Sequence, residues 1–337
     1  MRAARVGGVV VLAAAALGLA ACGPAATASP EVRVVRVGAP MRAPEWSDRA
    51  GVLLGLADSR VEKVDPSESY RSSLSVALPD VGADLATGLP SQSYVYVPQP
   101  GLNRVAVLSV ASLRQVSTVP GGRAPYYLAT DVGASVLLAL SRDGRSVTGT
   151  DLREHKVVAH QPVHAALGTH IDGPARERLV EFHLTGPRGI VHYQDGEREG
   201  SMSIPVADAA GDKTKVTRLY VAEQGTDRLL AVDTSKSQDN TLEVVGHADL
   251  GAPVRFVGVD DYQVYALAGD TLVVLSANSF EGFAGGKIPI VKRIPLSADL
   301  PAALHSGTPS GMAVGADRVW VTFAGQPYVV GIAKPAI

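Results

Sequence analysis

Residues 94–119 read YVYVPQPGLNRVAVLSVASLRQVSTV, and this stretch decides the fold. Polar residues and turn formers separate its three short runs rich in Val, Leu and Tyr, which are 94–97, 103–108 and 115–119. Runs of this length with β-branched and aromatic residues are typical of strands. Gly101, and Gly144 and Gly225 further along, are expected to supply the positive φ angle that tight hairpins need. The stretch therefore predicts antiparallel strands joined by short turns.

An apolar strand of this kind recurs through the whole chain. Its seven copies begin 40 to 45 residues apart, except for the last interval, which is 55. A period of this length, with four short strands in each repeat, is typical of β-propeller blades. The sequence therefore predicts an all-β, seven-bladed propeller with four-stranded antiparallel blades. The seven strands are 52–56, 94–97, 136–140, 179–182, 219–222, 264–267 and 319–322.

The same residues carry a family resemblance. Residues 94–108, with Val116-Ser117-Thr118-Val119 and Gly122-Arg123-Ala124-Pro125 after them, resemble the YVTN-type β-propeller repeat, whose pattern runs YVTN, NTVSVID, VVATIPVG, GxxP. The resemblance is good over 94–150 and 218–260 and degenerate elsewhere. Where that family usually has Thr-Asn after the first strand, this chain has Pro98-Gln99, Ser141-Arg142 and Glu223-Gln224. The resemblance implies a propeller, and it implies a lactonase-like hydrolase as one activity to test, because some similar propellers hydrolyse lactones at the channel mouth.

The last repeat lacks a strand. After Trp320 only one further apolar run remains, at 328–332, so a strand from elsewhere must complete the blade. Residues 32–37 are the expected supplier, because pairing both ends of the chain in one blade closes the ring and removes free strand edges. A pair of β-sandwiches divided near residue 200 is the alternative fold, but it does not require seven evenly spaced strands.

The N-terminus has the pattern of an export signal. Arg2 and Arg5 precede an uncharged apolar stretch, residues 6–21, and Leu19-Ala20-Ala21-Cys22 resembles the bacterial lipobox. Cleavage before Cys22, the one cysteine of the chain, and acylation of its thiol would anchor the protein durably to the membrane. A transmembrane anchor is the other interpretation, but about 20 apolar residues are needed to span a bilayer.

The expected organisation is a signal peptide at 1–21, a lipidated Cys with a flexible tether at 22–31, and a propeller at 32–337 on the extracytoplasmic face of the cell membrane. Loss of two arginines with the leader changes the formal net charge from −2 to −4, and the remaining basic residues are scattered. Nucleic acid is therefore not an expected partner. We expect a monomer without a cofactor, whose partners are the membrane, through the anchor, and an envelope protein, peptide or glycan.

The loops that enter the innermost strands form one mouth of a propeller channel, where side chains from several blades converge. Arg offers a bidentate fork and an aromatic ring offers a stacking face, so this mouth suits an anionic or glycan-like ligand. The loops carry few carboxylates, which disfavours a metal-dependent lactonase. The alternative is that these residues cap the channel and pair with local carboxylates. The candidate ligand-binding residues are Arg42, Trp46, Arg123, Tyr126, Arg255 and His305.

Six of the eight histidines fall between residues 155 and 192. Neutral imidazole is a good ligand for zinc or copper, and His164 and His170, with Asp172 nearby, are the candidates for a metal site. The alternative is that the histidines lie on different strands and loops and point in different directions. No nucleophile with an adjacent base stands out in the sequence. It therefore favours a non-enzymatic binding or scaffolding lipoprotein over a lactonase-like hydrolase.

Overall fold

The computed structural model describes residues 31–165, 169–173, 179–214, 216–235, 239–296 and 300–336. The predicted signal peptide, the predicted lipidation site at Cys22 and residues 23–30 of the predicted tether lie outside these ranges. Glu31–Ile337 form one compact unit. Within the described ranges, no helix is both long enough and apolar enough to cross a membrane.

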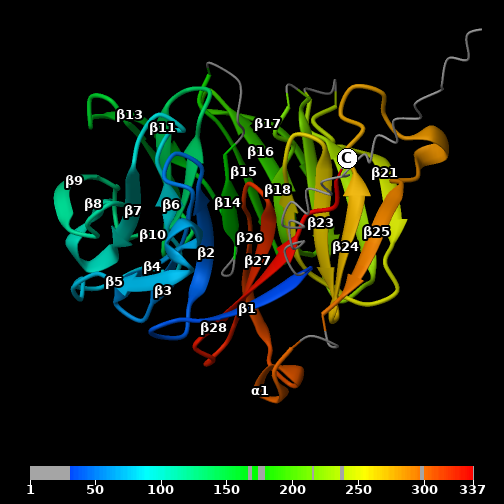
Figure 1. The fold of residues 1–337 in the computed structure, drawn as a ribbon. Helices are drawn as coiled ribbons and strands as arrows, with labels where there is room; N and C mark the ends of the chain where they lie inside the picture. The colour runs from blue at the N-terminus through cyan, green and yellow to red at the C-terminus, as the bar shows by residue number, and fades with distance from the viewer. Residues whose placement is uncertain are drawn as a thin grey trace, which may run out of the picture. The chain divides into compact units, whose positions relative to one another are not determined.

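The described residues form seven antiparallel sheets of four strands each, which confirms the predicted blades (Figure 1). Blade 1 contains β2 (Arg42–Ser47), β3 (Val52–Ala57), β4 (Arg60–Asp65) and β5 (Arg71–Leu74). Blade 2 contains β6 (Ala86–Thr87), β7 (Tyr94–Gln99), β8 (Arg104–Ser109) and β9 (Gln115–Pro120). Blade 3 contains β10 (Pro125–Asp131), β11 (Val136–Ser141), β12 (Ser146–Asp151) and β13 (Val157–Pro162). Blade 4 contains β14 (His170–Asp172), β15 (Glu181–Gly186), β16 (Gly189–Gln194) and β17 (Glu197–Met202).

The remaining blades follow the same order along the chain. Blade 5 contains β18 (Val206–Gly211), β19 (Arg218–Glu223), β20 (Arg228–Asp233) and β21 (Glu243–Asp249). Blade 6 contains β22 (Val254–Val259), β23 (Gln263–Ala268), β24 (Thr271–Ser276) and β25 (Ile290–Pro295). Blade 7 contains β26 (Pro309–Val314), β27 (Arg318–Phe323), β28 (Tyr328–Ala333) and β1 (Val32–Arg36). The short helical turns are η1 (Pro66–Glu68), η2 (Pro100–Leu102), η3 (Ala284–Gly286) and α1 (Ala302–His305).

The seven predicted apolar strands are the second strands of the blades. Every residue of β3, β11, β15, β23 and β27 is buried, because each of these strands lies inside its blade and is covered on both faces. The hydrophobic core is accordingly built between adjacent blades. Tyr96 and Val105 of blade 2, for example, pack in one cluster with Leu128 and Leu137 of blade 3.

The N-terminal strand completes the last blade. β1 pairs antiparallel with β28, from Val32 opposite Ile332 to Arg36 opposite Tyr328. In Figure 1 the blue β1 accordingly runs alongside the red β28. β2 of blade 1 also contacts β26 of blade 7, so the blades form a closed ring. Both ends of the described chain therefore share one sheet, as the sequence predicts.

Two local predictions need correction. The second strand of blade 4 begins at Glu181 and not at Leu179, and it includes polar side chains. In the first turn of blade 2, Asn103 adopts the left-handed conformation, with φ 51°, and Gly101 does not. Asn tolerates this conformation because its short side chain forms local hydrogen bonds. Gly144 (φ 67°) and Gly225 (φ 76°) do supply positive φ angles, as predicted.

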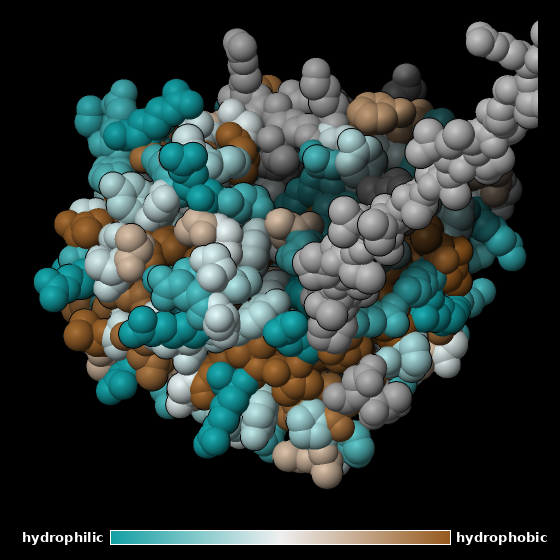
Figure 2. Space-filling view, viewed as in Figure 1, coloured by the Kyte–Doolittle hydropathy of each residue, from teal (hydrophilic) through white to brown (hydrophobic). Residues whose placement is uncertain are grey.

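The innermost strands of the blades form what we call the inner ring. Each of β2, β6, β10, β14, β18, β22 and β26 contacts the innermost strands of both neighbouring blades. Five of these strands, all except β6 and β14, contain a register shift near their start. Such bulges redirect side chains and are frequent at functional sites. Many exposed apolar residues lie instead on the outermost strands, and Figure 2 shows apolar residues in separate groups among hydrophilic ones.

Candidate functional site

The strand register assigns equivalent inner-ring positions to the seven blades. In every blade, one residue of the inner ring lies opposite the third residue of the second strand, and we call it the ring position. Five blades have a small residue there, namely Ala86, Ala129, Ala210, Gly258 and Ala313. Blades 1 and 4 have Glu45 and Asp172 instead. Two acidic side chains therefore occupy positions at which the other blades have almost no side chain.

In each blade, the residue two positions before the ring position belongs to a second set of equivalent residues. Residues i and i+2 of a strand point to the same side, so the two sets form two adjacent layers. Blades 2 and 5 contribute Asp84 and Asp208 to this second layer. The remaining members are Ala43, Tyr127, His170, Phe256 and Gly311. The two layers thus carry four carboxyl groups, from blades 1, 2, 4 and 5.

Two of these carboxyl groups, those of Asp84 and Asp172, raise the pKa of Glu45 and of Asp208. Burial raises the pKa of Glu45 to about 8, and the charges of Asp84 and Asp172 add to this effect, whereas Lys213 opposes it. Burial raises the pKa of Asp208 to about 7, again with contributions from Asp172 and Asp84. Blades 2 and 5 are not neighbours, so this influence indicates that carboxyl groups of non-adjacent blades lie near one another.

Hydrogen bonds hold three of the carboxyl groups in place. The backbone N–H of Gly211 donates to Asp172 Oδ2 (3.0 Å), and that of Val257 donates to Asp208 Oδ2 (2.7 Å). Each of these bonds joins one blade to the next. Burial also raises the pKa of Asp84 to about 7, while the Leu85 N–H and the Arg42 charge lower it. The hydrogen bonds of Asp172 and Asp208 therefore connect neighbouring blades and have a structural role. The Glu45 carboxyl group accepts no such bond from a described residue.

An aromatic group adjoins the carboxyl groups in blades 3 and 4. The rings of Tyr126 and Tyr127 meet edge to face at a centroid distance of 5.0 Å, and Tyr127 lies 4.8 Å from the ring of His170. The Arg142 guanidinium lies 4.8 Å from the centroid of Tyr126. Burial raises the pKa of Tyr127, with contributions from Tyr126 and Asp84, and burial lowers the pKa of His170. This arrangement places aromatic rings and a neutral imidazole beside the acidic groups.

The structure places the candidate ligand-binding residues in different environments. Arg42 bridges blades 1 and 2, because its guanidinium donates to the carbonyl oxygens of Gly82 (3.0 Å) and Ala83. Trp46 is buried and stacks on Trp320, with the ring planes 10° apart. Their predicted role in ligand binding is not tested by these contacts. The contacts do show that both side chains stabilise the fold.

Three further candidate ligand-binding residues, Arg123, Arg255 and His305, are exposed. Arg123 lies in the loop before β10, and its charge adds to the Ser141 hydrogen bond that lowers the pKa of the Asp143 carboxyl group. Arg255 occupies the bulge of β22 that is equivalent to the bulge at Tyr126. His305 lies at the end of α1 and lines a small pocket with Leu304 and other residues of blades 6 and 7, which are Gly269, Asp270, Leu296, Leu300, Gly307, Pro309 and Phe323.

The sequence pattern indicates Glu45 and Asp172 near the channel mouth, but it does not indicate Asp84 or Asp208. Few carboxylates were expected near the mouth, whereas Glu45, Asp84, Asp172 and Asp208 all lie in the two layers. The predicted metal ligands His164 and His170 remain a prediction. Within the described residues, one group brings three metal-ligating side chains together, with donor atoms within 4.8 Å of one another, and it consists of Glu181, His183 and His192. This group lies on the second and third strands of blade 4 and not in the inner ring.

Comparison with known proteins supports the architecture. No family model matches the chain, and no curated protein matches it. A chain of the mitotic checkpoint complex superposes with a TM-score of 0.70 at 13% identity, over 98% of this chain and 99% of that chain. The RRP9 WD40 repeats give a TM-score of 0.66 at 13% identity, over 90% and 97% of the two chains. Hydrazine synthase from Kuenenia stuttgartiensis gives 0.65 at 11% identity, over 90% and 98%. At such low identity the likeness shows the fold alone, which is a seven-bladed, WD40-like β-propeller.

Proposed function

We propose that this chain is a lipid-anchored binding propeller of the YVTN type that holds a positively charged segment of an envelope protein or peptide at the inner ring. The observation that carries the proposal is the convergence of four carboxyl groups from four blades. Two basic residues lower the pKa of these carboxyl groups. The charge of Arg42 acts on Asp84, and the charge of Lys213 acts on Glu45 and Asp172. The proposed ligand is therefore cationic, and not anionic as the sequence suggests.

The raised pKa values explain why a cation would bind. A carboxyl group with a raised pKa is one whose charged form is destabilised by burial and by like charges. A bound ammonium or guanidinium group offsets both effects, because it supplies the missing opposite charge. The ring of Tyr127 adds a further attraction, since cations bind to aromatic rings within about 6 Å of the centroid. Arg142 already stacks on Tyr126 in this way.

The proposed cellular location rests on the N-terminal sequence. Residues 1–21 have the pattern of an export signal, and Cys22 follows a lipobox-like tripeptide. A protein anchored in this way faces the envelope, where partner proteins and peptides with exposed lysine or arginine are accessible to it. The structures of similar fold include propellers within protein complexes, which is consistent with a binding role.

A lactonase-like hydrolase is the second candidate. Glu45, His170 and Asp172 lie on inner strands of blades 1 and 4, and they have donor types that a catalytic metal would need. However, the three-donor group found within the described ranges lies in blade 4, outside the inner ring. The geometry therefore supports binding better than metal-dependent hydrolysis.

The binding proposal is tested with a fluorescently labelled tetralysine peptide and the mature domain. Glu45→Gln and Asp84→Asn each remove one ionisable carboxyl group, which a bound cation would pair with, without changing side-chain size. Loss of one charged partner costs about 1–3 kcal/mol, so we expect the Kd for the peptide to rise roughly 5- to 150-fold. Asp58→Asn is the matched control, because Asp58 is exposed in the turn between β3 and β4, outside the inner ring, with a φ of 53° that Asn tolerates.

Two results would overturn the proposal. One is equal affinity of the wild-type domain for tetralysine and for a tetraglutamate peptide of the same length. The other is a Kd for tetralysine that does not change in Glu45→Gln or Asp84→Asn. Hydrolysis of simple lactones by the purified domain, abolished by a chelator and by His170→Ala, would instead support the lactonase-like alternative.

A further inference from the structure

Blade 4 differs from the other blades in its core. The third residue of the second strand is aromatic in four blades, as Tyr96, Tyr220, Tyr265 and Trp320, and leucine in two. In blade 4 this residue is His183. Opposite it on the third strand, five blades have a small or aliphatic residue, which is Val107, Gly149, Ala231, Val274 or Gly331. In blade 4 this residue is His192.

A carboxyl group completes the blade 4 cluster. Glu181 begins the same strand as His183, and its Oε1 lies 2.7 Å from His192 Nε2. The rings of His183 and His192 stack with centroids 4.7 Å apart. All three side chains are almost fully buried, with exposures of 2–3%. One carboxylate and two imidazoles are therefore enclosed together in the interior of the protein.

Several polar atoms of this cluster have no hydrogen-bond partner among the described residues. They are Glu181 Oε2, both ring nitrogens of His183, and His192 Nδ1. Of the polar side chains at the position equivalent to His183, Tyr220 Oη donates to the Ala277 carbonyl oxygen (2.8 Å) and Tyr265 Oη donates to Asp260 Oδ2 (2.8 Å), whereas Trp320 Nε1 has no partner among the described residues. Blade 4 differs in having four such atoms together in one cluster. Buried polar groups are normally paired, so the open donor and acceptor positions of blade 4 call for a ligand.

We propose that Glu181, His183 and His192 bind a zinc ion within blade 4. Two imidazoles and one carboxylate form a typical three-residue zinc ligand set, whereas calcium and magnesium prefer oxygen ligands alone. Tetrahedral ligands about 2.0–2.1 Å from zinc stand about 3.3 Å from one another. The donor atoms already lie within 4.8 Å of one another, so modest side-chain rotation brings them into range.

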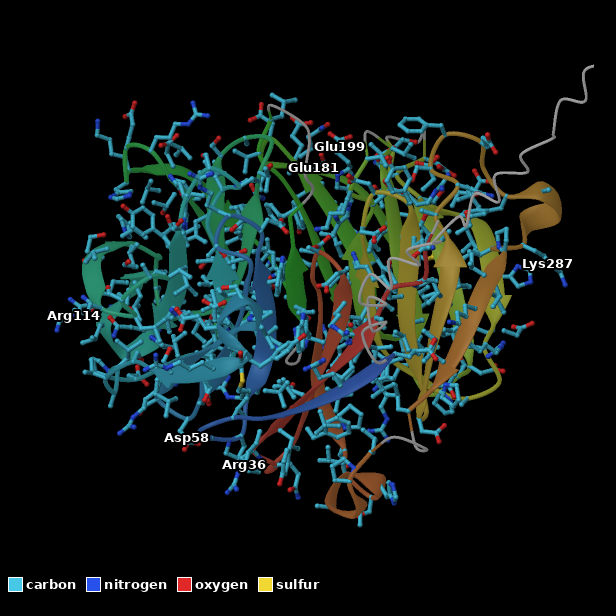
Figure 3. All side chains as sticks on the ribbon, viewed as in Figure 1. Arg36, Asp58, Arg114, Glu181, Glu199 and Lys287 are labelled. Atoms are coloured by element: carbon cyan, nitrogen blue, oxygen red, sulfur yellow. The ribbon has the colours of Figure 1, made fainter. Side chains whose placement is uncertain are left out.

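The surroundings suit such a site. Burial and the neighbouring His192 lower the pKa of His183 well below its ordinary value, so this imidazole is neutral and its lone pair is available. The Asp131 carboxylate of blade 3 accepts a hydrogen bond from the Glu181 N–H (3.0 Å), which fixes the start of the ligand-bearing strand. Zinc would then join the second and third strands of blade 4. Glu181 is labelled on these green strands in Figure 3.

The repeats themselves supply the test variants. Glu181→Gln copies Gln263 of blade 6, His183→Tyr copies Tyr265, and His192→Val copies Val274. The triple variant should therefore fold, because each residue is one that the same position accommodates elsewhere in this chain. His170→Ala is the control for nonspecific binding, since His170 lies outside the cluster.

Each protein is refolded after chelation, with and without zinc, and bound metal is measured by mass spectrometry after desalting. We expect one zinc per wild-type or His170→Ala molecule and at least a tenfold loss in the triple variant. The wild-type Tm should rise by roughly 4–8 °C at a hundredfold excess of free zinc over Kd, and magnesium should have no such effect. A folded wild-type protein that retains no zinc, or a folded triple variant that retains as much as wild type, would overturn the proposal.

Discussion

Glu45 has a strongly raised pKa, which reports on the electrostatic environment of the inner ring. Its pKa lies at about 8 in the folded protein against an ordinary value of 4.5, because burial and the neighbouring carboxylates of Asp84, Asp172 and Asp48 disfavour its charge. The folded state therefore binds a proton that the unfolded state has released between these two pH values. It follows that this group's contribution to stability is greatest at low pH and declines as pH rises through about 8.

This linkage predicts a measurable pH dependence. Between pH values of about 7 and 9 the wild-type Tm should fall, and in Glu45→Gln, which cannot ionise, the fall should be smaller. His183 does not affect the Tm in this pH range, because its lowered pKa destabilises the folded state only as pH falls through the ordinary value of 6.5. Differential scanning calorimetry of both proteins checks the prediction, with Asp58→Asn as control. Parallel Tm profiles for wild type and Glu45→Gln would contradict the assigned environment of Glu45.

Cys22 carries the proposed anchor and can be tested in cells. We expect Cys22→Ala to accumulate as an uncleaved precursor, because the lipobox-like sequence then lacks the thiol that receives the lipid. Mass spectrometry of the wild-type membrane fraction should find an acylated N-terminal cysteine. An intact, unmodified segment from Met1 to Cys22 in that fraction would disprove the prediction.

The residues of the inner ring show the limit of prediction from sequence. Glu45, Asp84, Asp172 and Asp208 lie in four different blades, and no local pattern connects them. Only the closed ring and the strand register bring them to equivalent positions. The pairing of His183 with His192 could have been predicted from the sequence, because only two residues, Pro187 and Arg188, join the two strands of that hairpin.

At the level of elements, the second strands were predictable because burial on both faces makes them continuously apolar. Blade 4 is the informative exception. Its second strand begins with Glu181 and includes His183, so the apolar pattern is weakest there and the predicted strand began two residues too early. The deviation from the repeat coincides with the proposed metal site, where polar residues replace core residues.

The strand β1 makes a second element-scale prediction. Deletion of residues 32–37 removes the partner of β28 and leaves blade 7 with three strands and an open edge. We therefore expect a large loss of thermal stability or aggregation. Deletion of residues 23–30 lies outside the propeller strands and should leave the Tm unchanged. Equal Tm values for the two deletions, measured by circular dichroism, would contradict closure by β1.

For the whole molecule, closure of the ring is what creates the proposed binding site. Seven inner strands in mutual contact place small residues beside Glu45 and Asp172, and they hold four carboxyl groups near one another. Folding brings these like charges together at a cost in free energy. A cationic ligand would offset that cost, because it stabilises the charged form of each carboxyl group. Binding should therefore release protons from the carboxyl groups whose pKa is raised.

The measurement that tests this account most directly is proton release on binding of the tetralysine peptide. Isothermal titration calorimetry at a pH of about 7.5, in buffers with different ionisation enthalpies, gives the number of protons exchanged. The account predicts release of roughly one proton per bound peptide, because Glu45 is mostly protonated at that pH and a bound cation favours its charged form. The Glu45→Gln/Asp84→Asn double variant should release far fewer protons. Binding without proton release in the wild-type domain, or unchanged release in the double variant, would contradict the central role of the acidic inner ring.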